Sequence, residues 1–153
     1  MEETRAMMRV CDLMDRDVVF CYPDDSVNDV VQMMEANQFR PVVVVHESGE
    51  VWGLVSRLAV IRFHAENLDK IRAEDVMRPY RIEIDPQWPI ERAIELMKRT
   101  RHEHLIIVDP HAGPRRPIGI LSSFDIVRYM SGIETGHFEQ ILKMPPEWTT
   151  SSP

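Results

Sequence analysis

A Ser-Ser-Phe-Asp segment at 122–125 carries the clearest chemistry in the chain. A strand is predicted to end near Leu121, and Ser122 is a good N-cap for a following helix. The first-turn N–H groups of a helix lack intrahelical partners and lie at the positive end of its dipole, which suits a phosphate or ribose oxygens. Asp125 would lie in that turn, where its carboxylate could accept both hydroxyls of a ribose. A structural interpretation stays open, in which Ser122 only caps the helix and Asp125 only complements the dipole.

The remaining candidate groups do not assemble into a catalytic or metal site. His102 and His104 flank Glu103 at a strand entry, and we expect the two rings to lie on opposite sides or in solvent, without a third metal ligand at a usual spacing. Cys11 and Cys21 are predicted to be packing thiols. The sequence has no Gly-x-Ser-x-Gly segment, no Walker loop and no Cys–His pair with an orienting partner. We therefore predict a non-catalytic protein without metal or cofactor.

Length and composition indicate a globular protein. The chain has 153 residues, 44% hydrophobic and 28% charged, which suits one domain or two small ones sharing a core. Its net charge of −7 argues against nucleic acid or an anionic membrane as a partner. No apolar run approaches the roughly 20 residues that cross a bilayer, and the first ten residues do not resemble a signal peptide. Two cysteines give no disulfide framework, so we expect a cytoplasmic protein.

Three segments of the first half recur, in order, in the second half. A shift of 63 residues lays 12–14 on 75–77 and 42–45 on 105–108, and a shift of 66 lays 53–56 on 119–122. One register held across about fifty residues with a single gap indicates a tandem duplication.

Each copy is predicted to be a β-α-β-β-α unit. In the first copy the predicted strands are 18–21, 42–45 and 51–55, with helices from Ser26 and over 56–66. Because about sixty residues bury too little surface alone, we predict an α/β fold in which the two copies pack about a pseudo-two-fold axis. The predicted divisions are a helical flank (1–9), the first repeat (10–68), the second repeat (69–131), and a C-terminal helix and tail (132–153).

The opening Asp-hydrophobic-Met, the aliphatic strands and the Gly-hydrophobic-hydrophobic-Ser segments, each present twice, resemble the paired cystathionine-β-synthase (CBS) domain, or Bateman module. The resemblance covers roughly residues 10 to 131. It implies a regulatory sensor that binds an adenosine-containing ligand, such as AMP, ADP, ATP or S-adenosylmethionine, in clefts between the copies.

The resemblance also implies which residues bind. The family places the ribose on the Asp of Gly-x-x-Ser/Thr-x-x-Asp, a pattern that Gly119, Ser122 and Asp125 complete and that Ala59 breaks in the first copy. Since the fold accepts Ala59, a functional role for Asp125 is favoured. The implied ligand site consists of Ser122, Ser123, Asp125, Asp15, Val19, Arg40 and Pro41. A second, weaker anion cleft would comprise Ser56, Arg57, Ala59, Arg78, Ile82, Glu103 and His104, and Ala59→Asp would be expected to strengthen it.

The identity of the ligand stays open at this point. Asp15 would repel phosphates unless Arg40, Arg16 or Arg128 offsets its charge, and S-adenosylmethionine is the alternative. The helix N-terminus and the arginines favour AMP or ADP.

The leading interpretation is thus a sensor that transmits occupancy to an unidentified partner. The alternative is a ligand-free dimerisation or docking platform that regulates a partner enzyme or transporter, and an enzyme is the remote third. The family implies a homodimer in which two modules form a flat disc. Its predicted interface uses apolar residues of the last helix of each copy, namely Ile61, Phe63, Ile126, Val127 and Tyr129.

Overall fold

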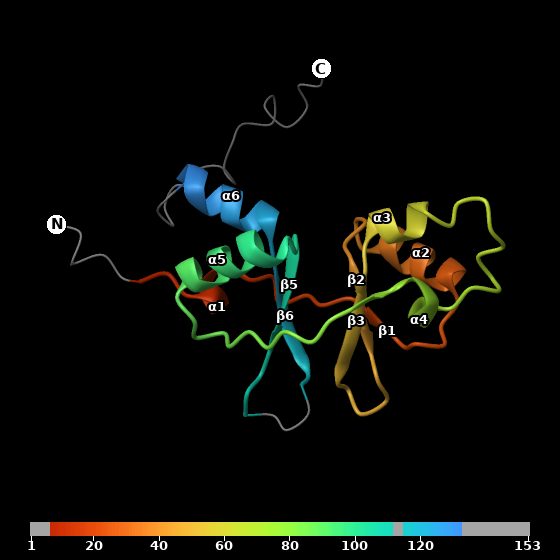
Figure 1. Ribbon diagram of the computed structural model, residues 1–153, viewed down its shortest axis with the longest axis horizontal. Helices are drawn as coiled ribbons and strands as arrows, with labels where there is room; N and C mark the ends of the chain where they lie inside the picture. Colours follow the sequence, from red (N-terminus) through yellow and green to blue (C-terminus); the bar gives the residue numbers. More distant parts are fainter. Residues whose placement is uncertain (1–6, 112–114, 133–153) are drawn as a thin grey trace, which may run out of the picture.

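The computed structural model describes residues 7–111 and 115–132, which form two lobes lying side by side (Figure 1). The first lobe contains a four-stranded sheet of order β1-β2-β3-β4, and the second contains the two-stranded sheet β5-β6. The elements in chain order are α1 (Val10–Leu13), β1 (Phe20–Cys21), α2 (Val27–Ala36), β2 (Val42–Val45), β3 (Val51–Val55), α3 (Arg57–Ile61), α4 (Ala73–Val76), β4 (Arg78–Pro79), α5 (Ile90–Thr100), β5 (His104–Val108), β6 (Pro117–Ser122) and α6 (Ser123–Gly132).

The central strands are buried on both faces. In β2, Val42 and Val44 pack in a core cluster with the apolar residues of α2, whereas Val43 and Val45 pack in a cluster shared by the two sheets. The same alternation occurs in β5, where Leu105 and Ile107 face one cluster and Ile106 and Val108 the other. Because successive side chains of a strand point to opposite faces, a continuous aliphatic run can pack in the core cluster on each face of the sheet. The predicted α/β pair of repeats is confirmed.

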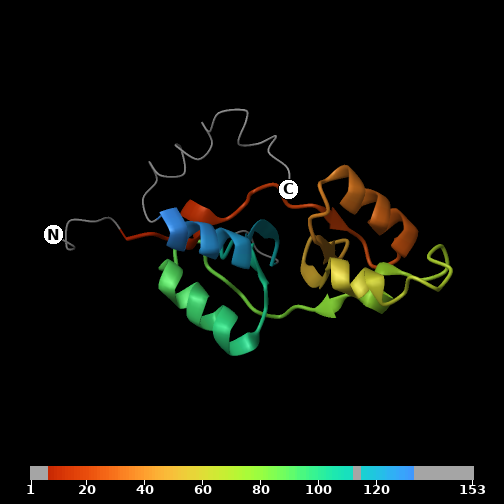
Figure 2. The same ribbon diagram turned by 90° about the horizontal axis from the view of Figure 1, so that it is seen from above.

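Each repeat begins with a short helix that packs on the opposite lobe. The Val10 N–H of α1 donates to the Trp88 carbonyl at 2.9 Å, and the Ala73 N–H of α4 donates to the Asp25 carbonyl at 2.8 Å. These two bonds are related by the 63-residue shift. The lobes are therefore interlocked by a symmetric exchange of their opening segments, as a pseudo-two-fold axis requires (Figure 2).

Two glycines make this exchange possible. Met14 packs against Gly119 on β6, and Met77 packs against Gly53 on β3. A Cβ atom at Gly119 would lie 2.5 Å from the Met14 sulfur, and one at Gly53 would lie 2.6 Å from the Met77 sulfur. The glycine of the repeated Gly-x-x-Ser pattern thus leaves room for the segment that crosses over.

Some predicted elements differ from the observed ones. The helix predicted over 56–66 ends at Ile61, after which the chain continues in tight turns such as the one closed by His64 N–H and the Ile61 carbonyl at 3.1 Å. The first strand begins at Phe20, because Val18 N–H closes a turn onto the Arg16 carbonyl. Of the predicted N-terminal helix, residues 7–9 are described and are not helical. The predicted C-terminal helix lies outside the described residues.

One side of the molecule is markedly apolar. Helices α3 and α6 lie on the same side of the two sheets (Figure 1), and their exposed large side chains are between 59% and 65% accessible. These side chains are Leu58, Ile61, Phe124, Val127 and Met130. Ile61 and Val127 match the predicted dimer residues. Ile126, Phe63 and Tyr129 instead pack on the cores of their own lobes, because the helices present those positions to the sheets.

Candidate functional site: a cleft between the lobes

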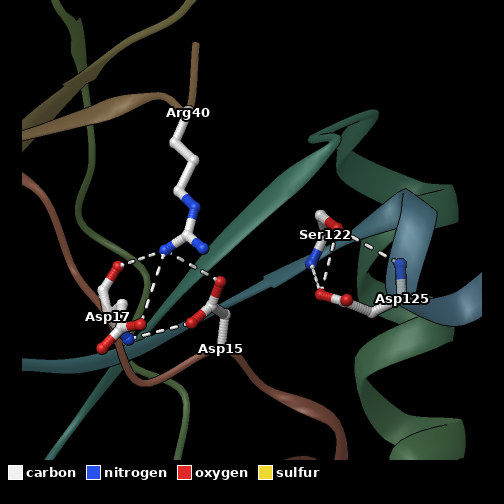
Figure 3. A network of polar contacts seen from close by, with 5 residues as sticks. All are labelled: Asp15, Asp17, Arg40, Ser122 and Asp125. Carbon is white, nitrogen blue, oxygen red and sulfur yellow. Dashed lines mark hydrogen bonds and ion pairs between the residues drawn. The ribbon is translucent and has the colours of Figure 1, made fainter. Parts of the chain in front are cut away.

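Asp125 is held at the start of α6 by reciprocal hydrogen bonds with Ser122, where β6 ends (Figure 3). The Ser122 Oγ accepts from the Asp125 N–H at 3.2 Å, and the Asp125 carboxylate accepts from the Ser122 N–H at 2.8 Å and from its hydroxyl at 3.0 Å. This arrangement is a capping box. In the first repeat, Ser56 Oγ accepts from the Ala59 N–H at 3.2 Å, but Ala59 offers no carboxylate in return. Asp125 therefore has a local structural role in addition to any ligand.

Asp15 reaches the same place because its segment crosses to the second lobe. Its N–H donates to the Ile120 carbonyl at 2.8 Å, and the Ile120 N–H donates to the Asp15 carbonyl at 2.9 Å. Ile120 lies two residues before Ser122 on β6. The pairing therefore fixes the Asp15 backbone beside the strand end that carries the capping box.

Arg40 enters the site from the first lobe through a strained loop. Gln38 and Phe39 both have φ of 61°, in the left-handed region that non-glycine residues rarely adopt, and such positions each cost of order 1–3 kcal/mol. The Arg40 guanidinium then lies 3.1 Å from the Asp15 carboxylate and donates to the Asp17 carbonyl at 3.1 Å (Figure 3). Arg40 thus offsets the charge of Asp15, the residue expected to repel phosphates.

These groups line a cleft of about 540 Å³ between the lobes, within the roughly 300–1,000 Å³ of small-molecule sites. The structure brings five of the seven predicted site residues together in its wall, namely Asp15, Arg40, Pro41, Ser122 and Asp125. Residues adjacent to them in sequence also line it, although the repeat pattern gave no signal for them. They are Asp17, Gln38, Phe39, Ile120 and Phe124.

The other two predicted residues lie beside the cleft. The Val19 carbonyl accepts from the Val43 N–H at 2.8 Å, which ties Val19 to β2, and its side chain lines a neighbouring hollow of about 420 Å³ that also includes Arg40. Ser123 is turned toward Glu103, with its N–H donating to the Glu103 carbonyl at 2.8 Å and its hydroxyl 3.5 Å from the Glu103 carboxylate.

Two residues expected in the second cleft line the first one. Arg57, the first residue of α3, and His104, the first residue of β5, both face the cleft of Asp125. The 63-residue shift relates His104 to Pro41, which lines the same cleft, so this cleft reaches the axis between the repeats. The repeat pattern assigns each residue to one of the two equivalent clefts. It gives no sign that a residue near the axis can line the other cleft.

The remaining residues expected in the second cleft have other surroundings. Ser56 caps α3, and Arg78 is exposed in β4. Ile82 packs against the core clusters, and the backbone carbonyl of Glu103 accepts from Ser123. Of the predicted set, then, Arg57 and His104 are the two that line the cleft carrying Asp125.

Among the described residues, carboxylates and guanidiniums line the cleft in equal number. Carboxylates come from Asp15, Asp17 and Asp125, and guanidiniums come from Arg40, Arg57 and Arg128. Burial lowers the pKa of His104, with Arg57 acting in the same direction and the carboxylates of Glu103 and Asp125 opposing it. A lowered pKa keeps this imidazole neutral at neutral pH.

The two histidines of the His-Glu-His segment lie in different surroundings. His102 packs against Tyr80 with 5.7 Å between the ring centroids, whereas His104 lines the cleft. Burial and the nearby Arg78 lower the pKa of His102. Over 7–111 and 115–132, no group of three His, Cys, Asp or Glu side chains could hold a metal ion. In the same residues no helix is long and apolar enough to cross a membrane.

Known proteins resemble this chain over most of its length. An L-aspartate semialdehyde sulfurtransferase from Methanosarcina acetivorans is 25% identical over 132 residues, which are 86% of this chain and 25% of that protein. The chain spans about a quarter of the length of this curated relative.

Solved structures share the fold at lower identity. The CBS domain pair of protein MJ0100, in complex with 5′-methylthioadenosine and S-adenosyl-L-methionine, has a TM-score of 0.74 at 20% identity and covers 84% of this chain and 100% of its own. The cytosolic domain of the Mg²⁺ channel MgtE, in complex with ATP, has a TM-score of 0.66 at 20% identity and covers 78% of this chain and 48% of its own.

The family assignment rests on the sequence itself. The sequence profile of the CBS domain matches residues 10–66 and again residues 73–132, which together make up more than half of the chain. The two matched segments contain the two interlocked repeats described above. This chain therefore belongs to the CBS domain family and carries two CBS domains in tandem.

Proposed function

We propose that the chain is a non-catalytic regulatory sensor that binds one adenosine-containing ligand in the cleft of Asp125. The observation that carries the proposal is the asymmetry between Asp125 and Ala59 in otherwise equivalent Ser-capped turns. A carboxylate there can accept ribose hydroxyls, and each charge-assisted bond contributes roughly 1.5–3 kcal/mol. Support also comes from the similar CBS pairs solved with methylthioadenosine, S-adenosylmethionine and ATP. We further propose a cytoplasmic location, since Cys11 and Cys21 are free thiols.

We propose an adenine nucleotide, AMP or ADP, rather than S-adenosylmethionine as the ligand. Asp15 is already paired with Arg40 at 3.1 Å, so its charge is offset before any phosphate enters. Arg57 and Arg128 line the cleft on the α3 and α6 sides, and guanidinium groups suit phosphate oxygens. A sulfonium group would meet these cations, whereas Arg40 already pairs with both Asp15 and Asp17. Among the described carboxylates of the lining, that leaves Asp125 to face a cationic ligand.

Titration calorimetry with AMP, ATP and S-adenosylmethionine tests the proposal. Wild type is expected to bind AMP with one site per chain, and Asp125→Ala is expected to bind about ten- to a hundred-fold more weakly. Asp29→Ala is the matched control, because Asp29 occupies the same turn of α2, where its N–H donates to the Ser26 Oγ at 3.0 Å. If wild type binds none of the three, or Asp125→Ala binds unchanged, the alternative of a ligand-free docking platform takes its place.

We propose that the assembly is a homodimer built on the apolar face of α3 and α6. Five large apolar side chains at 59–65% exposure on neighbouring helices exceed what an isolated soluble module normally presents. A second copy of the same face would bury it by a two-fold contact. The regulated partner is a protein that reads the state of this dimer.

A further inference from the structure

A second pocket, of about 480 Å³, lies where the β2–β3 turn of the first lobe meets the start of β6. Figure 1 shows the β2–β3 turn on the side of the sheets away from α3 and α6. The pocket is lined by Phe20, Tyr22 and His46 of the first lobe and by Arg116 of the second. Arg16, in the connection between the lobes, also lines it. Among the residues that the structure describes, this pocket shares no lining residue with the cleft of Asp125. Its size lies within the range of about 300–1,000 Å³ for small-molecule sites.

Aromatic rings form one wall of this pocket. Phe20 is 51% exposed and Tyr22 is 45% exposed, and the two rings meet edge to face with centroids 6.1 Å apart. His46 stacks on Trp52 with centroids 4.8 Å apart, and Trp52 lines an adjoining hollow that shares Tyr22 and His46. Each exposed ring is thus oriented by a neighbouring ring. A set of oriented, exposed rings is suited to stacking against a planar ligand.

His46 contributes a hydrogen-bond donor. Ser48 occupies the Nδ1 side of the ring, with its N–H donating to His46 Nδ1 at 3.3 Å and its Oγ also 3.3 Å from Nδ1. Nε2 is therefore the ring nitrogen that can meet a ligand, and its N–H can donate to an anion. Stacking on Trp52 fixes the plane of this ring.

Two guanidinium groups give the pocket a positive bias. Arg16 is anchored to the Cys11 carbonyl at 3.4 Å, and Arg116 lies against Gly49, where a Cβ atom would come within 3.1 Å of its Nε. Gly49 also has φ of 92°, so a side chain there would be strained as well as crowded. Glu47 is the one carboxylate in the described lining, which leaves an excess of one positive charge in a chain of net charge −7.

We propose that this pocket is a second ligand site, which takes a planar aromatic ring carrying one carboxylate or phosphate group. The ring would stack face to face on one of Phe20 and Tyr22 and meet the other edge to face, because the two rings are perpendicular. The anion would lie between Arg16 and Arg116, with His46 Nε2–H as an additional donor. Arginine suits such an anion because its planar fork matches two oxygens at once. Both lobes supply the site, so its occupant would contact the two repeats together.

Indole-3-acetate is the probe for a carboxylate, and AMP added to the Asp125→Ala protein is the probe for a phosphate, because that variant disables the ribose site. Binding is followed by calorimetry and by NMR shifts of the full chain. Indole-3-acetate is expected to saturate, to shift resonances of Phe20, Tyr22 and His46, and to bind Asp125→Ala as it binds wild type. Arg116→Gln and Phe20→Ser are each expected to weaken it about ten-fold or more, whereas Arg99→Gln on α5 is expected to have no effect.

Tryptamine carries the same indole ring as indole-3-acetate but has a cation in place of the carboxylate. Comparing the two ligands therefore separates recognition of the charge from stacking of the ring. Tryptamine is expected to bind at least about ten-fold more weakly than indole-3-acetate. The proposal is overturned if indole-3-acetate does not saturate, if tryptamine binds equally well, or if both pocket variants bind as wild type does. Loss of indole-3-acetate binding in Asp125→Ala would also overturn it, since the probe would then occupy the other cleft. AMP binding to Asp125→Ala that Arg116→Gln removes would support a phosphate as the natural anion.

Discussion

The Tyr80 hydroxyl forms hydrogen bonds with both backbone groups of Ile106: it accepts from the N–H at 2.9 Å and donates to the carbonyl at 3.4 Å. In the first repeat the equivalent residue is Val43, whose partner is a backbone group: the Val43 N–H donates to the Val19 carbonyl at 2.8 Å. A side chain in the second repeat thus replaces a strand of the first. This explains why the first strand of the second repeat is reduced to a single bridge between Ile84 and Ile107.

Tyr80 also distinguishes the second repeat from the first at a position that lines the ligand cleft. The 63-residue shift relates it to Asp17, which lines the ligand cleft, yet Tyr80 is 2% exposed and packs in the cluster between the sheets. Burial raises the pKa of Tyr80 to about 12. At the position where the first repeat places a cleft-lining aspartate, the second repeat therefore places a buried ring.

Tyr80→Phe should destabilise the fold by about 1–3 kcal/mol, because it leaves a buried N–H and a buried carbonyl without their partner. Urea unfolding measures this cost. Tyr22→Phe is the control, because Tyr22 is 45% exposed and its change should lie within about 0.5 kcal/mol. Equal stability of the two variants would mean that water replaces the Tyr80 hydroxyl at Ile106.

Ala59→Asp should stabilise α3 without creating a second ligand site, which revises the expectation from sequence. The new carboxylate could complete a capping box with Ser56, worth about 0.5–1 kcal/mol. By the 63-residue shift, Tyr80 and Glu103 stand where the cleft of Asp125 has Asp17 and Arg40. Calorimetry should therefore return the same number of AMP molecules per chain for Ala59→Asp as for wild type, and an additional site in the variant would contradict the role given to Tyr80.

Asp125→Ala should cost about 0.5–1 kcal/mol of stability, since it opens the capping box while the Ser122 cap remains. Thermal unfolding without ligand measures it, and Asp125→Asn, which keeps an oxygen acceptor for the Ser122 N–H, should recover part of the loss. A stability equal to that of wild type would show that the capping box contributes nothing.

His104 should make the fold less stable in mild acid. Burial lowers its pKa in the folded state below the ordinary value of 6.5, so the unfolded chain binds more protons between these two values. The contribution of neutral His104 to the free energy of unfolding is complete above about pH 6.5. It is lost as the pH falls toward the pKa of His104 in the folded state. Urea titrations should show that His104→Gln loses less stability than wild type between about pH 7.5 and pH 5. Parallel curves for the two proteins would contradict this assignment.

Val127→Glu should convert a dimer into a monomer, because it places a charge in the apolar face of α3 and α6, where Val127 is 61% exposed. Light scattering should give twice the chain mass of 17.9 kDa for wild type and the single chain mass for the variant. Arg99→Glu, on the surface of α5, should remain dimeric. A wild type that stays at 17.9 kDa at micromolar concentration would exclude the proposed interface.

Much of the fold could be predicted from local pattern. The aliphatic runs 42–45 and 105–108 indicated strands buried on both faces, and Ser122 indicated a helix start, because alternation and capping depend on neighbouring residues alone. The repeat register then predicted that the two copies would pack as equals. The ligand proposal built on Asp125 and Ala59 came from the same register.

The tertiary structure decided which residues meet. Asp15 and Arg40 are paired because the opening segment of the first repeat crosses to β6, a long-range exchange that no local spacing encodes. Arg57 and His104 line the cleft of Asp125, although the repeat pattern assigns them to the other cleft. Tyr80 replaces a strand because its ring reaches the backbone of Ile106 across the space between the sheets. Local interactions determined the helices and strands of this protein. The packing of the two lobes determined which charged side chains meet in its site and where the two repeats differ.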